Sequence, residues 1–327
     1  MTQHSLLASA RRIAPLAWPV FIGQLAVLAF STVDTVMVAR YAALDLAALA
    51  VGAAAYITIF VGFMGVVLAI GPIAGQLFGA KKLHEAGEQL HQAVWLALGL
   101  SVLGSALLLM PDPFLYAAQT QPAVAEKVRA YLGYLAIALP PALIFQAFRG
   151  FNTAVSRPKI VMVLQLVGLS LKVPLNALLI YGMPAWQVPS MGAAGCGLAS
   201  AIVMWLQLLL AWWVLRRDPF YAPFGLHVTR LARPAWHSLK ELLRLGVPMG
   251  LSILIEVTGF TFMAIFISRI GATAVAGHQL AANLVSLMFM MPLAIANATT
   301  TWWRRASAPP RRWMPAAWAG TACNSAR

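Results

Sequence analysis

The chain has 327 residues, of which 61% are hydrophobic and 10% charged, whereas an ordinary soluble domain carries about 25% charged residues. Its net charge is +14, a value that in a soluble protein would suggest a nucleic-acid partner. The composition excludes an ordinary soluble domain and points to lipid, so the positions of the charges relative to the apolar runs decide what the positive charge means.

Eight apolar runs are long enough to cross a hydrocarbon core, which needs roughly 20 residues. They cover residues 15–38, 48–72, 93–110, 131–149, 160–181, 195–215, 246–268 and 275–297. We expect each run to form a transmembrane helix, which makes the chain an all-α polytopic membrane protein.

The first run carries a carboxylate, Asp34. An ionised carboxylate in the middle of a bilayer costs about 2.5 to 3.5 kcal/mol on insertion scales, so it needs a partner or water. Gln24, Ser31 and Thr35 follow a helical spacing that places a polar stripe beside Asp34 on one face. We expect this stripe to face an internal cavity; the alternative is that Asp34 only reaches the outer headgroups.

A charged segment follows the second run and contains His84, Glu88 and His91 at the spacing i, i+4, i+7. Such spacing could gather metal ligands on one helical face. In a charged segment a solvated amphipathic turn is the favoured interpretation, and we predict no metal site. The sequence also lacks a nucleophile constellation, a phosphate loop and a dinucleotide fingerprint, so we expect neither enzyme activity nor a cofactor.

The fifth run contains two candidate partners for Asp34. Asn176 lies five residues from the end of its run and Asp34 four from the end of the first, so the two side chains could sit at one depth. Lys172 lies one turn away from Asn176 on the same face and is a second candidate.

The seventh run contains Glu256 near its centre, where reaching the interface is harder. Of nine acidic residues, only Glu256 and Asp34 lie within apolar runs, and the others fall in loops or at the edges of spans. Gln279 and Asn283 share a face of the eighth run and are candidates to support an ion or substrate site there.

The basic residues lie between the spans and alternate strongly from one side to the other. With a cytoplasmic N-terminus, the inner segments hold 18 Lys and Arg and the outer segments 4, and only Lys172 lies inside a span. This positive-inside bias predicts that both ends are cytoplasmic. It accounts for the net charge, and no nucleic-acid partner is expected.

An internal repeat aligns the first and seventh spans at an offset of 229 residues, so that LAWP at 16–19 meets LGVP at 245–248. We therefore expect one complete six-helix bundle, residues 1–215, a basic cytoplasmic linker, 216–244, and the first two helices of a second, repeated bundle, 245–299. Residues 300–327 contain five Arg and no acid and do not match the corresponding residues of the first half. We interpret this tail as the product of a shifted reading frame; an ordinary basic tail is the alternative.

Several stretches resemble one family, the multidrug and toxic compound extrusion (MATE) transporters, over roughly residues 10–300. They are PLAWPVFIGQLAVLAFSTVDTVMVARY, GQLFGAKK, RGFNTAVSRPK and PLNALLIYG in the first half, and GVPMGLSILIEVTGF and AGHQLAANLVSLMFMMPLAI in the second. The resemblance implies two six-helix bundles around a central cleft. It also implies ion-coupling carboxylates on the first and seventh helices, at Asp34 and Glu256.

The resulting prediction is a cation-coupled antiporter, using H⁺ or Na⁺, that exports organic cations and drugs across the bacterial inner membrane as a monomer. Because the sequence resembles only eight of twelve spans, we expect transport by this chain alone to be impaired. Two alternatives stay open: a flippase for lipid-linked precursors, which would favour several basic residues inside the spans, and an inactive pseudogene product or passive scaffold. The sequence identifies neither the substrate nor the coupling ion.

Overall fold

The computed structural model describes residues 6–117, 121–182, 189–227 and 232–268, with five single positions between 281 and 292. Before residue 17 it describes the backbone only. The predicted eighth span, with Gln279 and Asn283, and the tail at 300–327 lie outside the described residues, apart from those single positions.

The described chain is built from helices. They are α1 (Leu6–Ala39), α2 (Ala43–Val67), α3 (Ile70–Gly79), α4 (Leu83–Leu109), α5 (Asp112–Ala117), α6 (Pro122–Ala154), α7 (Pro158–Tyr181), α8 (Gly192–Arg217), the 3-10 helix η2 (Pro219–Phe224) and α9 (Trp236–Ser268). Seven candidate membrane spans lie among the described residues, with α2 and α3 together forming one of them. The predicted class, an all-α polytopic membrane protein, is confirmed.

Several helices extend beyond the apolar runs that predicted them. α6 covers 122–154 where the run covers 131–149, and α9 begins at Trp236, before the predicted second bundle. The linker predicted at 216–244 therefore contains the end of α8, η2 and the first turns of α9. Hydropathy detects only the part of a helix that lies in hydrocarbon, whereas its polar turns continue into the interface.

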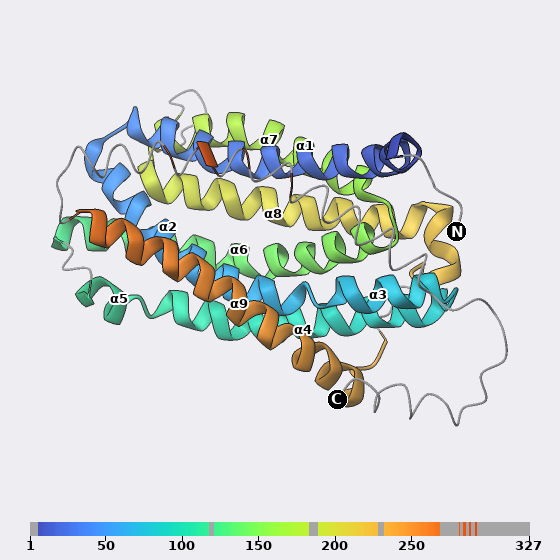
Figure 1. Ribbon diagram of the computed structural model, residues 1–327. Helices are drawn as coiled ribbons and strands as arrows, with labels where there is room; N and C mark the ends of the chain where they lie inside the picture. The colour runs from blue at the N-terminus through green and yellow to red at the C-terminus, as the bar shows by residue number, and fades with distance from the viewer. Residues whose placement is uncertain are drawn as a thin grey trace.

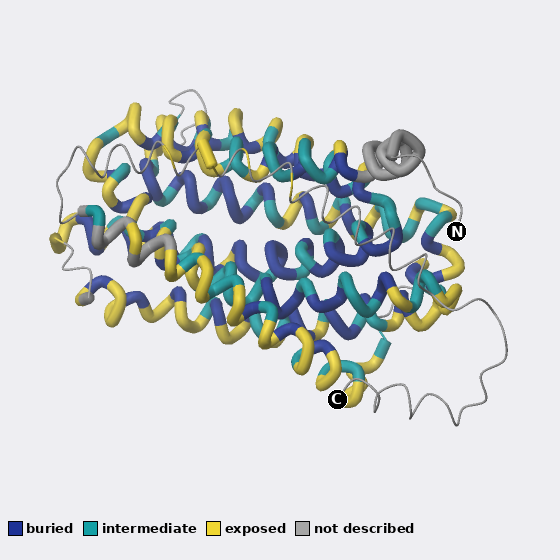
Figure 2. The backbone as a smooth tube through the Cα atoms, in the orientation of Figure 1, coloured by how far each residue is buried: buried dark blue, intermediate teal, exposed yellow. Residues whose placement is uncertain are grey.

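Helices α1 to α4 and α6 to α8, called the first bundle below, are organised around α6, the most buried of the spanning helices. It packs against α2, α4 and α8, while α7 bridges α8 and α1 (Figure 1). The buried residues concentrate in the middle of the bundle (Figure 2). This order leaves the inner faces of α1, α2, α6, α7 and α8 turned toward one another.

α9 reaches the first bundle by packing across α2 (Figure 1). Glycines make the close approach possible, because a Cβ at Gly65 would collide with the backbone of Gly250, and one at Gly246 would collide with the carbonyl of Val66. Small residues that let two backbones approach are typical of helix pairs in membranes.

The two ends of the bundle differ in charge. The basic end, where α6 finishes, α7 begins and α8 finishes, carries Arg149, Arg157, Lys159, Arg216 and Arg217. Arg157 pairs there with Asp218 at 2.7 Å. Tyr221 of η2 donates a hydrogen bond to Asn152, and burial raises the pKa of its phenol.

The far end is closed by a buried carboxylate. Asp45, 2% exposed, accepts hydrogen bonds from Lys127 Nζ at 3.0 Å and from the backbone N–H of Ala193 at 2.9 Å. These bonds connect α2, α6 and α8. The carboxylate that the sequence assigned to a span edge therefore holds three helices together.

Candidate functional site

A cavity of about 480 Å³ lies inside the first bundle, within the range of small-molecule sites. Eighteen of its 27 lining residues are apolar or aromatic, and they come mainly from α1, α2, α6 and α8; they include Phe30, Leu49, Tyr56, Phe60, Met64, Tyr131, Leu135, Phe145 and Met204. Nine polar side chains from α1, α6, α7 and α8 interrupt this wall: Gln24, Ser31, Asp34, Thr35, Gln146, Arg149, Gln165, Ser200 and Gln207. An apolar chamber with a few polar groups is suited to an amphipathic ligand.

Asp34 lies at the wall of this cavity and is held from α7. Its Oδ1 accepts a hydrogen bond from Asn176 Nδ2 at 2.7 Å and lies 3.0 Å from Lys172 Nζ. Asp34 is only 9% exposed, and it lines the cavity. The structure therefore brings Asp34 together with both of the partners that the sequence offered for it, Asn176 at the same depth and Lys172 one turn away.

Lys172 lies behind Asp34, and its side chain is fully buried. The ammonium donates to Ser200 Oγ on α8 and lies 4.3 Å from the centre of the Phe30 ring. A carboxylate, a hydroxyl and an aromatic face are the groups that can compensate a buried cation. Lys172 is the internal counter-ion of Asp34.

Asn176 leaves one polar atom without a partner. Its Nδ2 donates to Asp34, but Oδ1 is buried and accepts no hydrogen bond from the residues that the structure describes. Buried amide oxygens are normally satisfied. An unused oxygen beside a carboxylate is the kind of ligand that a hard cation prefers.

The polar stripe predicted on α1 lies along the same cavity. Ser31 donates to the carbonyl of Leu28 and Thr35 to the carbonyl of Ser31, both at 3.0 Å. Their hydroxyl protons are thus used within the helix, and their oxygens remain as acceptors for a ligand. Gln24 lies ten residues before Asp34 on α1, nearer the basic end, and also lines the cavity.

Glu256 lies elsewhere. Its side chain is exposed on α9, and it does not line the cavity. Within the described residues, the structure does not bring the two predicted ion-coupling carboxylates together. Gln279 and Asn283, the candidate neighbours of Glu256 on the eighth span, are not among those residues.

Arg149 also lines the cavity, although it stands at the end of an apolar run, where the sequence pattern indicates a basic segment between spans. It lies in α6, five residues before the helix ends, and lines both the large cavity and an adjoining pocket of about 20 Å³. Gln24 and Gln165 also line both spaces. The first bundle therefore contains two inward-facing basic residues, Lys172 and Arg149, where the sequence pattern indicated only Lys172.

These features define a class: a multi-pass α-helical membrane protein with a ligand-sized chamber and a buried ion pair in its wall. A model of the MatE family matches residues 19–178 and 248–306. The chain belongs to the MatE family, which confirms the resemblance seen in the sequence and agrees with the prediction of a protein that is not an enzyme.

Two curated relatives illustrate the similarity. The chain is 41% identical over 295 residues to a probable multidrug resistance protein NorM of Aromatoleum aromaticum, covering 90% of this chain and 63% of the relative. It is 36% identical over 296 residues to the multidrug resistance protein MdtK of Photorhabdus laumondii, covering 90% and 64%. The chain thus spans less than two thirds of the length of these relatives.

Solved structures share the fold. A crystal structure of MATE in complex with MaD5 aligns with a TM-score of 0.80 and 20% identity, covering 91% of this chain and 66% of that one. An outward-facing multidrug resistance MATE family transporter of the MOP superfamily aligns with a TM-score of 0.76 and 20% identity, covering 89% and 63%. At this identity the likeness concerns the fold.

Proposed function

We propose that the chain acts in cation-coupled export of drugs and organic cations across the bacterial inner membrane, with its first bundle providing an ion-coupling site at Asp34. The names of the NorM and MdtK relatives support multidrug export. The alternation of basic residues supports an inner-membrane protein with a cytoplasmic N-terminus. In this orientation the basic end of the bundle is cytoplasmic and Asp34 lies toward the outside.

The observation that carries the proposal is the position of Asp34 between the cavity and a buried cation. Its carboxylate contacts Lys172 and Asn176 on one side and borders the ligand chamber on the other. A change in the charge of Asp34 therefore acts on the cavity and on the α1–α7 contact at the same time.

Coupling follows from neutralising this carboxylate. A proton or Na⁺ that binds Asp34 competes with Lys172 and with any cationic ligand for the same negative charge. The loss of the ion pair also weakens a direct connection between α1 and α7. One elementary charge that moves inward gains about 2.3 kcal/mol per 100 mV, enough to drive modest uphill export.

The repeat extends the proposal to α9. We propose Glu256 as the second ion-coupling carboxylate, with Gln279 and Asn283 as its supporting residues. Its central position in an apolar helix supports this role, because an intramembrane carboxylate is by default a functional candidate.

A binding experiment tests the coupling site without requiring the chain to complete a transport cycle. Ethidium binding to the purified chain in detergent is measured by fluorescence between pH 5 and 8, with and without 100 mM NaCl against choline chloride. We expect protons, and more weakly Na⁺, to displace the dye in the wild type, and Asp34→Asn to abolish this competition. Competition that persists in a folded Asp34→Asn chain would refute the role of Asp34.

Ethidium accumulation in pump-deficient cells that express the chain then tests export itself. Lower accumulation that depends on Asp34 would show that this chain transports. The matched control is Asp112→Asn, because Asp112 is a far-end carboxylate whose only described ion pair, with Arg129, is exposed.

A flippase for lipid-linked precursors is the second candidate. Arg149 at the cavity wall favours it, because anionic headgroups need basic partners inside the bundle.

A further inference from the structure

The cavity has an unbalanced positive charge at its basic end. Asp34 and Arg149 are the charged residues among the described side chains that line it. The charge of Asp34 is already compensated by Lys172 at 3.0 Å. The guanidinium of Arg149 has no such compensation, since none of the ion pairs formed by the described residues includes it.

Arg149 is also poorly satisfied by hydrogen bonds. Its one described side-chain bond goes from Nη1 to Gln146 Oε1 at 3.5 Å, which is long for a charge-assisted bond. Arg157, near the same end, has a carboxylate at 2.7 Å and a Phe220 ring at 4.0 Å. Arg149 thus lacks, among the described residues, the carboxylate and aromatic partners that Arg157 has.

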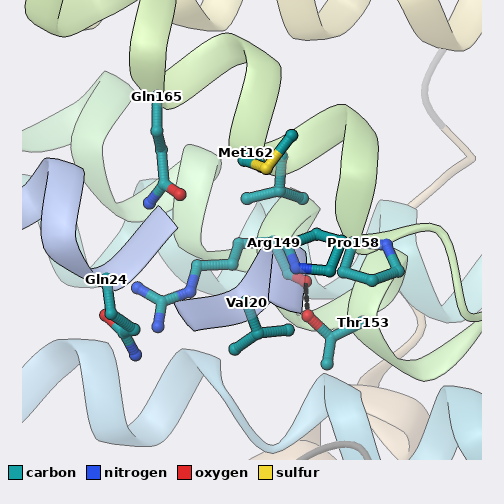
Figure 3. Close-up of a pocket in the computed structure, with 9 residues that line it drawn as sticks. Val20, Gln24, Arg149, Thr153, Pro158, Met162 and Gln165 are labelled. Carbon is teal, nitrogen blue, oxygen red and sulfur yellow. Dashed lines mark hydrogen bonds between the residues drawn. The ribbon is translucent and has the colours of Figure 1, made fainter. Parts of the chain in front are cut away.

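The surroundings of Arg149 supply further donors. The guanidinium points toward Gln24 and Gln165 inside the adjoining pocket (Figure 3). Thr153 and Pro158 close the pocket on the side of the basic end. A planar fork of N–H groups flanked by two amides can bind the oxygens of a carboxylate or phosphate in two places.

We propose that Arg149, with Gln24 and Gln165, forms an anion subsite at the basic end of the cavity, which binds the carboxylate or phosphate group of an amphipathic ligand. The apolar wall between Tyr56 and Phe145 takes the body of the ligand. Gln24 and Asp34 are ten residues apart on α1, which corresponds to about 15 Å along a helix. A ligand of that length with an amine at its other end would reach Asp34. A zwitterionic ligand could therefore contact Arg149 with its anionic group and Asp34 with its amine.

This inference rests on the proposed function, because it names the substrate chemistry of the same cavity. It fails separately: ion competition at Asp34 in a chain that shows neither an Arg149-dependent carboxylate preference nor Arg149-dependent lipid retention would overturn the anion subsite alone. Anion binding at Arg149 in a chain without ion competition would overturn the coupling role alone.

The test uses a matched pair of ligands, anthracene-9-carboxylate and its neutral carboxamide. Equilibrium dialysis measures their binding to the detergent-solubilised chain against empty micelles. We expect the wild type to prefer the carboxylate by about 10-fold, the value of one charge-assisted hydrogen-bonded contact. Arg149→Gln should remove the preference, and Arg149→Lys should retain part of it. The matched control is Arg129→Gln, on the same helix but in an exposed ion pair with Asp112.

A second arm distinguishes a lipid headgroup from a free anion. The chain is extracted from phosphatidylcholine vesicles that contain phosphatidylglycerol, and retained lipid is counted by native mass spectrometry. Phosphatidylglycerol retention that is lost only in Arg149→Gln identifies a lipid phosphate as the occupant. A carboxylate preference that is lost only in that variant identifies a free anion. Both results support the subsite, and a variant that equals the wild type in both assays overturns it.

A measurement on the wild type keeps the proposal testable should Arg149→Gln fail to fold. Phenylglyoxal modifies accessible arginines, and peptide mass spectrometry reports the extent at Arg149 and Arg129. We expect anthracene-9-carboxylate to slow modification at Arg149 by several-fold and leave Arg129 unchanged, while the carboxamide protects neither. Equal protection by both ligands would overturn the subsite.

Discussion

Lys172 and Asp34 form an ion pair with unequal access to the cavity. Their charged atoms are 3.0 Å apart, yet the lysine side chain is fully buried and the aspartate side chain is 13% exposed. Asp34 can therefore exchange its partner for a ligand or a proton, whereas Lys172 depends on Asp34.

This asymmetry predicts the stability of the two single variants. Asp34→Asn leaves a buried, unpaired ammonium and should lower the free energy of unfolding by about 3 to 5 kcal/mol. Lys172→Met leaves a carboxylate that keeps its bond from Asn176 and borders the cavity, so its cost should be smaller. Reversible unfolding in mixed micelles measures both, and the double variant should recover much of the loss of Asp34→Asn.

The exposed Arg129–Asp112 pair is the control for this cycle. Both side chains are more than half exposed, so breaking the pair should change stability by about 0 to 1 kcal/mol. Equal losses in Asp34→Asn and Lys172→Met would contradict the asymmetry.

The same pair predicts which cation the site accepts. The ammonium of Lys172 already occupies the position beside Asp34 where Na⁺ would bind, whereas a proton can neutralise Asp34 without displacing it sterically. We expect Na⁺ to stabilise the wild type weakly and to stabilise Lys172→Met clearly, through Asp34 and the unused Oδ1 of Asn176. Thermal unfolding in NaCl and choline chloride measures this difference, and Lys172→Met/Asn176→Ala should lose it.

The α2–α9 contact predicts opposite outcomes for two glycines three residues apart. A Cβ at Gly65 would collide with the backbone of Gly250, while one at Gly62 meets nothing within 4 Å. Gly65→Ala should therefore destabilise the packing of α9 on α2, and Gly62→Ala should leave it unchanged or improve it through helix propensity. Disulfide cross-linking between cysteines introduced at Val66 and Met249 would report the contact, and equal cross-linking in both variants would contradict the packing.

The sequence predicted the class of fold and the main cluster because both depend on simple regularities. Apolar runs identify spans, and a charge inside a run demands a partner at the same depth, which led to Asp34, Lys172 and Asn176. The cavity position of Arg149 was not predicted, because Arg149 stands at the end of an apolar run, and there the position along the helix does not reveal which way the side chain points. The burial of Asp45 and its contacts with α6 and α8 were not predicted for the same reason.

Asp45 is a buried carboxylate to which we assign a structural role, in contrast to the coupling role proposed for Asp34. Its oxygens accept bonds from Lys127 Nζ and from the backbone N–H of Ala193. Asp45→Asn can keep the bond from Ala193, and Lys127 is 38% exposed and can turn toward water, so the loss of stability should be modest. Asp45→Ala leaves the buried N–H of Ala193 unsatisfied and should lower the free energy of unfolding by about 1 to 3 kcal/mol more than Asp45→Asn does.

Both Asp45 variants, once folded, should retain the competition of protons or Na⁺ against ethidium, because Asp45 does not line the cavity. Loss of that competition in a folded Asp45→Asn chain would move the coupling site from Asp34 to the far end of the bundle.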